Sequence, residues 1–139
     1  MAAVALDTMV ISALLHPSRT HSKATEYRAL IGSRAVVVSF AVVTELRFGA
    51  LKAGWGELRK RGLERDLTKF TVVQPDDDLM HRCAELRARS ESIAHPLGQK
   101  IHEADRWIAA TCLYLAVPLV SDDGVFEDVE GLRLERTNI

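Results

Sequence analysis

The 139 residues are 47% hydrophobic and 27% charged, a balance that indicates one globular domain over residues 1–139 and excludes a disordered chain. The formal net charge of −1 provides no overall basic field, so a polyanionic partner would have to be held by a local patch or through a bound metal ion. No apolar run approaches the roughly 20 residues of a membrane span, and no signal-peptide pattern opens the chain, so we expect a cytoplasmic protein that contacts no membrane.

Strand patterns alternate with helical patterns along the chain. Short apolar runs predict strands, at residues 4–6, 35–38, 70–73, 118–121 and 132–134. Apolar residues at helical spacing predict helices, at residues 9–15, 20–31, 40–52, 58–67, 76–93 and about 102–116. The continuous β-branched run at 35–38 is typical of a strand that is covered on both faces. Together these elements predict an α/β fold with a parallel sheet of four or five strands, joined by right-handed crossovers.

Local sequence signals mark several boundaries of these elements. Thr8 could cap the first helix, Ser39 could cap the helix that begins at Phe40, and His95–Gly98 predicts a loop. The two cysteines lie in helical patterns without a CxxC pairing, at Cys83 and Cys112. That placement favours small buried side chains in a reducing compartment over a disulfide or a metal site.

Four acidic positions stand out by their context. Asp7 follows the first strand, Glu45 lies in the apolar helix after the second strand, Asp105 begins an apolar helical stripe, and Asp122-Asp123 follows the fourth strand. In a parallel sheet, such positions converge on one crevice at the carboxyl ends of the strands. Carboxylates gathered there repel one another unless a cation neutralises them, and oxygen ligands suit Mg²⁺ or Mn²⁺. The chemistry that this arrangement supports is hydrolysis of a phosphodiester bond.

Each acid also has a purely structural alternative. Asp7 could only cap the first helix, and Glu45 could extend its charge to solvent or pair with Arg47 or Lys52. Asp105 could pair with Arg106 or cap the last long helix, and Asp122-Asp123-Gly124 is also a turn sequence. The shared feature, that all four occur at corresponding ends of strand–helix units, favours the site over these alternatives.

Four segments in chain order resemble the acidic motifs of PIN-domain ribonucleases. Leu6-Asp7-Thr8 is similar to the opening motif, and Val43-Thr-Glu-Leu-Arg-Phe-Gly49 is similar to the second. Glu103-Ala-Asp-Arg-Trp-Ile-Ala-Ala110 resembles the third, and Pro118-Leu-Val-Ser-Asp-Asp-Gly-Val-Phe126 the fourth. Length and motif spacing both resemble the VapC toxins of bacterial type II toxin–antitoxin pairs, over essentially the whole chain.

The resemblance implies a fold, an activity and partners. The fold would be a three-layer α/β/α domain, and the activity that of an endoribonuclease that depends on Mg²⁺ or Mn²⁺ and cleaves RNA. The resemblance also implies a homodimer, alone or within a larger toxin–antitoxin assembly. A VapB-type antitoxin would inhibit the enzyme by placing a peptide tail in the active-site groove.

The resemblance also assigns residues. Asp7, Glu45 and Asp105 match the core acids, and Asp123 is the fourth acid if Ser121-Asp122-Asp123 aligns with the Thr-x-Asp of the family. Ser121 would then be the hydroxyl that helps to position an acid and a water molecule. The expected metal ligands are Asp7, Asp105 and Asp123, with Glu45 and Asp122 as further candidates.

Two features of this chain depart from the family pattern. Many relatives carry Asn or His immediately before the third acid, where this chain has Ala104. The fourth motif has two consecutive acids, which leaves the choice between Asp122 and Asp123 open; our prediction is Asp123.

Basic and aromatic residues supply further candidates for RNA contacts. The basic ones are Arg59, Lys60, Arg61, Arg65, Lys69, Arg82, Arg87 and Arg89. Acidic residues are interspersed among them, which favours solvated helix faces over a phosphate-binding patch. We expect Trp107 and Phe126 in the core rather than as base-stacking platforms, and Trp55 at a dimer contact or a groove. His102 could act near phosphate, but we expect a lone surface histidine.

Two other classes of protein share some of these features. A phosphoryl-accepting receiver domain would place paired acids after its first strand and a lysine after its last, and this chain has neither. A PIN-like fold that serves only for binding would gain stability by losing its mutually repelling acids. The sequence therefore favours the nuclease.

Overall fold

The computed structural model describes residues 2–17 and 22–137. Five strands form one parallel sheet in the order β3-β2-β1-β4-β5. Their bounds are β1 Ala3–Leu6, β2 Ala35–Ser39, β3 Thr71–Val73, β4 Leu119–Val120 and β5 Leu134–Glu135. The α-helices are α1 Thr8–Leu15, α2 Ala24–Ile31, α3 Phe40–Lys52, α4 Glu57–Leu67, α5 Asp77–Ser92 and α6 Glu103–Leu115. Short 3₁₀ helices are η1 Pro96–Gly98, η2 Lys100–His102 and η3 Gly124–Phe126.

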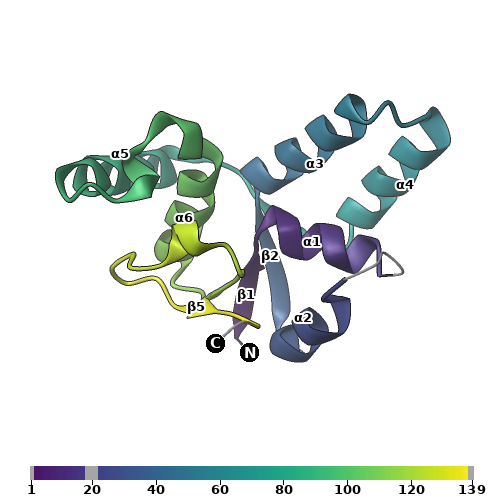
Figure 1. Ribbon diagram of the computed structural model, residues 1–139, viewed down its shortest axis with the longest axis horizontal. Helices are drawn as coiled ribbons and strands as arrows, with labels where there is room; N and C mark the ends of the chain where they lie inside the picture. Colours follow the sequence, from purple (N-terminus) through teal and green to yellow (C-terminus); the bar gives the residue numbers. More distant parts are fainter. Residues whose placement is uncertain (1, 18–21, 138–139) are drawn as a thin grey trace.

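The helices form a layer on each side of the sheet. Helices α1 to α4 lie on one side, and α5 and α6 lie on the other (Figure 1). This division follows from the strand order: the chain runs outward from β1 through β2 to β3, then crosses back to β4 on the other side of β1. Right-handed crossovers in opposite directions must lie on opposite faces. The expected three-layer α/β/α fold is confirmed.

Strand β1 is the point at which the direction of the chain reverses. Its neighbours β2 and β4 lead to helices and loops on opposite sides, which opens a crevice at the carboxyl ends of the strands. Asp7 leaves β1 at this edge, Ser121 leaves β4 beside it, and α3 begins directly after β2. The topology alone therefore brings three of the four predicted acidic segments together.

The central strands are held by complete burial of their apolar side chains. Val4, Leu6, Leu119 and Val120 have no exposed surface, and they join one cluster of buried side chains that includes residues of all six α-helices. Burying a Val or Leu side chain contributes roughly 1.5–3 kcal/mol. The two strands that carry acids at their ends are thus the most firmly packed part of the sheet.

Strand β2 is less covered than its apolar sequence predicts. Ala35 is exposed, Val36 is half-buried, and only Val38 and Ser39 are buried. The reason lies in the register, because β3 pairs only from Val37 onward and leaves the start of β2 with a neighbouring strand on one side. The expectation of a strand covered on both faces is correct only for its carboxyl end.

Several element boundaries differ from the sequence prediction. Helix α1 begins at Thr8, and its N-cap is Asp7, so the expectation that Thr8 caps this helix is wrong. The helix expected at 20–31 begins at Ala24; residues 20 and 21 lie outside the described residues. The last strand is Leu134–Glu135, because these residues reach the register of β4. In the part of the chain that the structure describes, no helix is long and apolar enough to cross a membrane.

Gly98 in η1 provides a test of how closely the loop after α5 packs on that helix. A Cβ at Gly98 would lie 2.7 Å from the backbone nitrogen of Glu91. We expect Gly98→Ala to lower the free energy of unfolding by about 1–3 kcal/mol, because backbone must move to accept the methyl group. Gly62→Ala in α4, where the nearest atom is 3.9 Å away, should raise it by up to about 1 kcal/mol. Urea denaturation of both variants measures the difference, and equal stability of the two would contradict the packing.

Candidate active site

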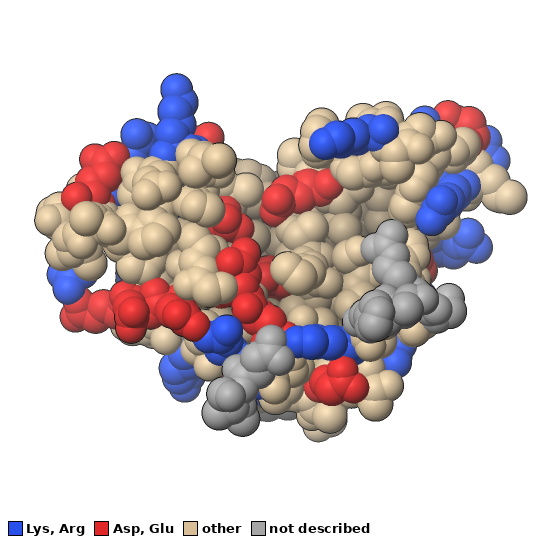
Figure 2. Space-filling model, in the orientation of Figure 1, with Lys and Arg blue, Asp and Glu red and all other residues tan. Residues whose placement is uncertain are grey.

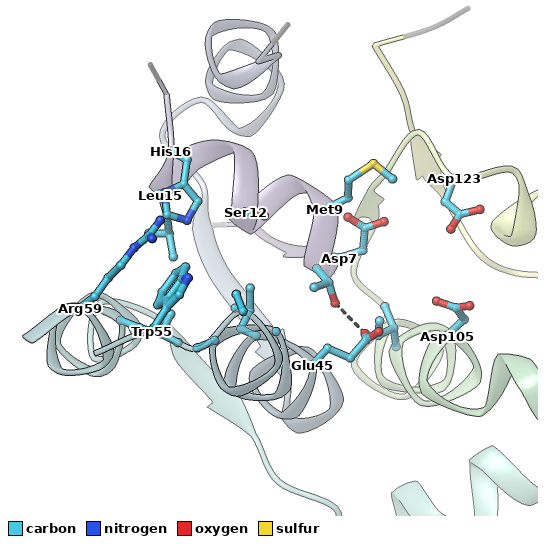
Figure 3. A pocket seen from close by; sticks show the side chains of 17 residues that line it. Asp7, Met9, Ser12, Leu15, His16, Glu45, Trp55, Arg59, Asp105 and Asp123 are labelled. Carbon is cyan, nitrogen blue, oxygen red and sulfur yellow. Dashed lines mark hydrogen bonds between the residues drawn. The ribbon is translucent and has the colours of Figure 1, made fainter. Parts of the chain in front are cut away.

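A cavity of about 690 Å³ opens at the carboxyl ends of the strands. In the space-filling view, Asp and Glu atoms run down the middle of the hollowed face between the two halves of the molecule (Figure 2). Four of the sequence-predicted acids line the cavity: Asp7, Glu45, Asp105 and Asp123. Their side chains come from four separate segments and lie around one end of it (Figure 3). Asp122 is not among the lining residues.

Asp7 is the most buried of these acids, with 5% of its surface exposed. Its Oδ1 accepts a hydrogen bond from the Val10 amide at 3.0 Å and so caps α1. Its Oδ2 accepts a short hydrogen bond from the hydroxyl of the fully buried Ser121. Asp7 therefore caps α1 and lines the cavity at once, because each of its carboxylate oxygens has a different partner.

Burial raises the pKa of Asp7 from 3.8 to about 6. The hydrogen bonds from Ser121 and Val10 oppose the rise, while the nearby carboxylates of Asp123 and Asp105 add to it. Two of the predicted acids thus lie close enough to Asp7 to disfavour its negative charge. This repulsion is the expected signature of a site that is suited to a cation.

Glu45 is held by a neighbour that the sequence analysis assigned to helix capping. The Thr8 hydroxyl donates to Glu45 Oε1 at 2.6 Å, as the dashed line in Figure 3 shows. Arg47, a possible ion-pair partner of Glu45, instead binds Glu64 at 2.7 Å. The only sequence signal for the role of Thr8 is a hydroxyl residue directly after Asp7.

Asp105 has a partner on the residue just before its helix. His102 Nδ1 lies 3.0 Å from Asp105 Oδ2, and both side chains are half-buried. The expectation that His102 is a lone surface histidine is therefore wrong. Arg106, the alternative partner, is buried and donates to the carbonyl oxygen of Leu97 at 2.7 Å. Asp105 consequently faces the cavity rather than forming an ion pair with Arg106.

The consecutive acids after β4 turn in different directions. Asp123 lines the cavity and also caps η3, where its Oδ1 accepts from the Val125 amide at 3.0 Å. Asp122 binds residues outside the cavity instead: its carboxylate accepts from the Tyr27 hydroxyl at 2.9 Å, the Thr137 amide at 2.8 Å and the Lys23 ammonium at 3.2 Å. Burial, followed by this carboxylate, raises the pKa of the Tyr27 phenol. The sequence carried no signal for these three partners.

The cavity suits a divalent cation by its chemistry rather than by a preformed geometry. Its donors are carboxylate oxygens, which Mg²⁺ and Mn²⁺ prefer, and the mutual repulsion at Asp7 would be relieved by positive charge. Among residues 2–17 and 22–137, however, no group of three or more His, Cys, Asp or Glu side chains is already arranged to hold a metal ion. The carboxylates that line the cavity are therefore suitable ligands for Mg²⁺ or Mn²⁺, but they are not already gathered around one point.

The opposite end of the cavity is formed by an aromatic and basic cluster. The Arg59 guanidinium lies 4.0 Å from the centre of the Trp55 ring, and His16 meets the same ring edge-on at 5.9 Å. All three residues line the cavity. We expected Arg59 on a solvated helix face, and it also lines the cavity. Its basic neighbours form ion pairs instead, Lys60 with Glu57 and Lys69 with Asp66.

The remaining sequence predictions about aromatic residues and cysteines concern packing. Phe126 is buried, as expected, and Trp107 is half-buried against Phe40 with ring centres 5.0 Å apart. Cys83 and Cys112 are buried and not disulfide-bonded. None of the four lines the cavity.

The geometry defines a class of protein: a parallel α/β domain with an acidic cavity at the reversal point of its sheet. The model of the PIN-domain family matches residues 4–132, and the chain belongs to this family. It is 31% identical over 133 residues to Ribonuclease VapC5 of Mycobacterium tuberculosis (strain ATCC 25618 / H37Rv), a match that covers 94% of this chain and 90% of that protein. The resemblance noted in the four motifs is confirmed, and the receiver-domain alternative is excluded.

Solved structures share the fold. DNA-bound VapBC from Salmonella typhimurium has a chain that is 23% identical, with 98% of each chain covered and a TM-score of 0.79. A member of the VapBC family of toxin–antitoxin systems, VapBC-5 from Mycobacterium tuberculosis, is 25% identical, with 100% of each chain covered and a TM-score of 0.69. The α/β/α architecture is therefore the one seen in VapBC structures.

The raised pKa of Asp7 predicts a pH-dependent stability in metal-free buffer. Folded Asp7 keeps its proton up to about pH 6, whereas unfolded Asp7 loses it near 3.8, so the free energy of unfolding should fall as pH rises through this window. A shift of about 2 pKa units corresponds to roughly 3 kcal/mol. Asp7→Asn, which can still cap α1, should remove this fall. Urea denaturation across the window, with a chelator present, compares the two proteins; parallel pH profiles would contradict the assignment.

The two consecutive acids should differ in their importance for stability. Asp122→Ala removes the bonds to Lys23, Tyr27 and Thr137 and should lower the free energy of unfolding by about 3 kcal/mol, because three bonds are lost and the hydroxyl of the buried Tyr27 loses its acceptor. Asp123→Ala removes only the cap of a short 3₁₀ helix and should have an effect of about 1 kcal/mol or less. Thermal and urea unfolding measure both, and a larger loss in Asp123→Ala would reverse the assignment.

Proposed function

We propose that this protein is a toxin ribonuclease of the VapC type, which hydrolyses phosphodiester bonds within RNA in the cytoplasm and is neutralised by a VapB-type antitoxin. The observation that carries the proposal is the meeting of Asp7, Glu45, Asp105 and Asp123 around one cavity in a chain of the PIN-domain family. The 31% identity to a protein named as a ribonuclease supports the reaction. The likeness to VapBC structures supports the antitoxin as a partner.

In this proposal Asp7, Asp105 and Asp123 hold Mg²⁺ or Mn²⁺ by their carboxylate oxygens. When bound, the ion supplies a water molecule of lowered pKa and positive charge for the phosphate. Asp122 takes no part in this set, because its oxygens are occupied by Tyr27 and its other partners. Asp123 is thus the fourth acid.

The other residues of the site orient these acids. The Ser121 hydroxyl donates to Asp7 Oδ2 and accepts from the Asp123 amide at 3.0 Å, so one buried side chain fixes the relation between two acids. Thr8 holds Oε1 of Glu45. No described residue donates a hydrogen bond to Glu45 Oε2, and this oxygen can accept a proton from the attacking water.

The proposal extends to assembly. One cluster of buried apolar side chains includes residues of all six α-helices and of three of the five strands, with Val72 of β3 and Leu134 of β5 packed against it, which supports a single nuclease domain over residues 1–139. Large apolar side chains are exposed on α3, with Phe48 at 62% and Leu51 at 67%, and these supply surface for a homodimer or for the antitoxin. Measuring the molar mass of the protein in solution, with and without antitoxin, tests whether a homodimer or a complex forms.

Loss of a core acid should abolish cleavage and leave the fold intact. We expect Asp7→Asn and Asp105→Asn each to reduce the Mg²⁺- or Mn²⁺-dependent cleavage rate by roughly a hundredfold or more. Asp78→Asn, an exposed acid of α5 far from the cavity lining, is the matched control and should cleave like the unaltered protein. Mapping the products of total cellular RNA measures activity, and circular dichroism checks the fold.

Full activity in both core-acid variants would overturn the mechanism. Calorimetry of protein freed of antitoxin tests the remaining alternative, a PIN domain that only binds. That alternative predicts no affinity for Mg²⁺ or Mn²⁺, whereas the nuclease predicts an affinity that Asp7→Asn weakens.

A further inference from the structure

The end of the cavity opposite the acids has a charge and a shape that the hydrolytic chemistry does not use. Arg59 is the one Lys or Arg among the described residues that line the cavity. No carboxylate of the described residues pairs with it, and its guanidinium instead lies over the Trp55 ring. Figure 3 shows this pair, with His16 beside it, near the carboxyl-terminal end of α1, whereas the four acids lie around the amino-terminal end of that helix.

Stacking on Trp55 holds the guanidinium in place. A guanidinium 4.0 Å above an indole is attracted by the face of the ring and loses part of its freedom before any ligand arrives. Trp55 is itself half-buried, and His16 meets it edge-on. Arg59 is exposed, so its N–H groups remain able to donate to a ligand.

Apart from Ser12, the wall between the two ends is apolar. It is formed by side chains of α1, α3 and α4 and the segment that joins the last two: Leu15, Leu46, Ala50, Ala53 and Leu63. An apolar wall beside a stacked cation and ring accepts the face of a nucleobase, since every base has a π face and stacking does not require a particular sequence. A cavity of about 690 Å³ falls within the range of small-ligand sites.

The charge pattern selects a polyanion with repeated phosphates. The acidic end repels a phosphate unless a cation neutralises it, whereas the Arg59 end attracts a phosphate directly. A single-stranded polynucleotide meets both requirements, because it presents one phosphate for reaction and a neighbouring nucleotide for the basic end. A free anion or an acidic peptide would use only one end.

We propose that Trp55 and Arg59 form a subsite for the nucleotide that flanks the cleaved phosphodiester, in which Arg59 donates to the phosphate and the Trp55 ring positions the guanidinium and contacts the base. The subsite rests on the proposed ribonuclease function, and it makes these two residues determinants of RNA binding rather than catalytic residues.

RNA binding without cleavage tests the subsite. In an Asp7→Asn background, the anisotropy of a fluorescein-labelled, short single-stranded oligoribonucleotide of mixed sequence reports affinity. Arg59→Gln should weaken binding about tenfold and reduce the slope of log affinity against log salt by about 0.7, the contribution of one phosphate contact. Trp55→Ala should weaken binding by about five- to a hundredfold. Arg61→Gln removes the same charge from an exposed position of α4 outside the cavity lining and should bind like the background.

Two further variants separate the contact from the fold. Arg59→Lys keeps the charge without the planar stack and should bind with intermediate affinity. Trp55→Phe keeps an aromatic ring, so it should retain more affinity than Trp55→Ala. This comparison holds whether or not Trp55→Ala stays folded. In otherwise unaltered protein, Arg59→Gln should raise KM for RNA cleavage with little change in kcat.

Tryptophan emission gives a readout that does not depend on activity. The chain has two tryptophans, so Trp55 is the single emitter in a Trp107→Phe variant. Adding the oligoribonucleotide to that variant should quench its emission, and Arg59→Gln should reduce the quenching at equal RNA concentration.

The results of these experiments distinguish a failure of the subsite from a failure of the ribonuclease function. If the protein cleaves RNA but Arg59→Gln and Trp55→Ala bind the oligoribonucleotide as tightly as Arg61→Gln does, the subsite is wrong and the nuclease remains. If the variants lose affinity only for an antitoxin-derived peptide, the cluster is a protein-binding surface and the subsite is also wrong. If RNA binding depends on Arg59 while no cleavage occurs with any divalent cation, the ribonuclease function fails, and Trp55 and Arg59 are an RNA-binding site that flanks no cleaved bond.

Discussion

The hydrogen bond between Ser121 and Asp7 is the interaction on which the site depends. It joins the ends of the two most deeply packed strands, β1 and β4, across 114 positions of the chain. It partly offsets the burial of a carboxylate at the end of an apolar strand. Because the same hydroxyl accepts from the Asp123 amide, the positions of two acids follow from one buried serine.

Around this bond, each acid serves the fold and the site at once. Asp7 caps α1, Asp123 caps η3, and Asp105 bonds to His102 at the start of α6. These contacts hold the three carboxylates in place, and all three line the cavity. The arrangement is electrostatically unfavourable without a cation, since Asp123 and Asp105 both raise the pKa of Asp7. The fold thus gives up stability at the place where the proposed metal ion would bind.

The sequence was sufficient to predict the fold class and the segments that carry the acids, because strand–helix alternation dictates a parallel sheet and acids after its strands must share an edge. It was insufficient where a side chain's direction depends on distant partners. Asp122 turns away from the cavity because Lys23, Tyr27 and Thr137 meet there, and no local pattern encodes that meeting. Arg59 could not be separated from its basic neighbours on α4 for the same reason: its distinction is a contact with Trp55 across a turn.

The pairing of β1 with β4 has a consequence for when the acidic cavity can form during folding. Contacts between distant parts of a chain close late in folding, after local helices have formed. A chain in which Ala5 has not yet met Leu119 lacks the Asp7–Ser121 hydrogen bond, and its four acids do not yet line one cavity. Because of this strand order, the acidic cavity can be complete only after the chain as far as β4 has joined the sheet.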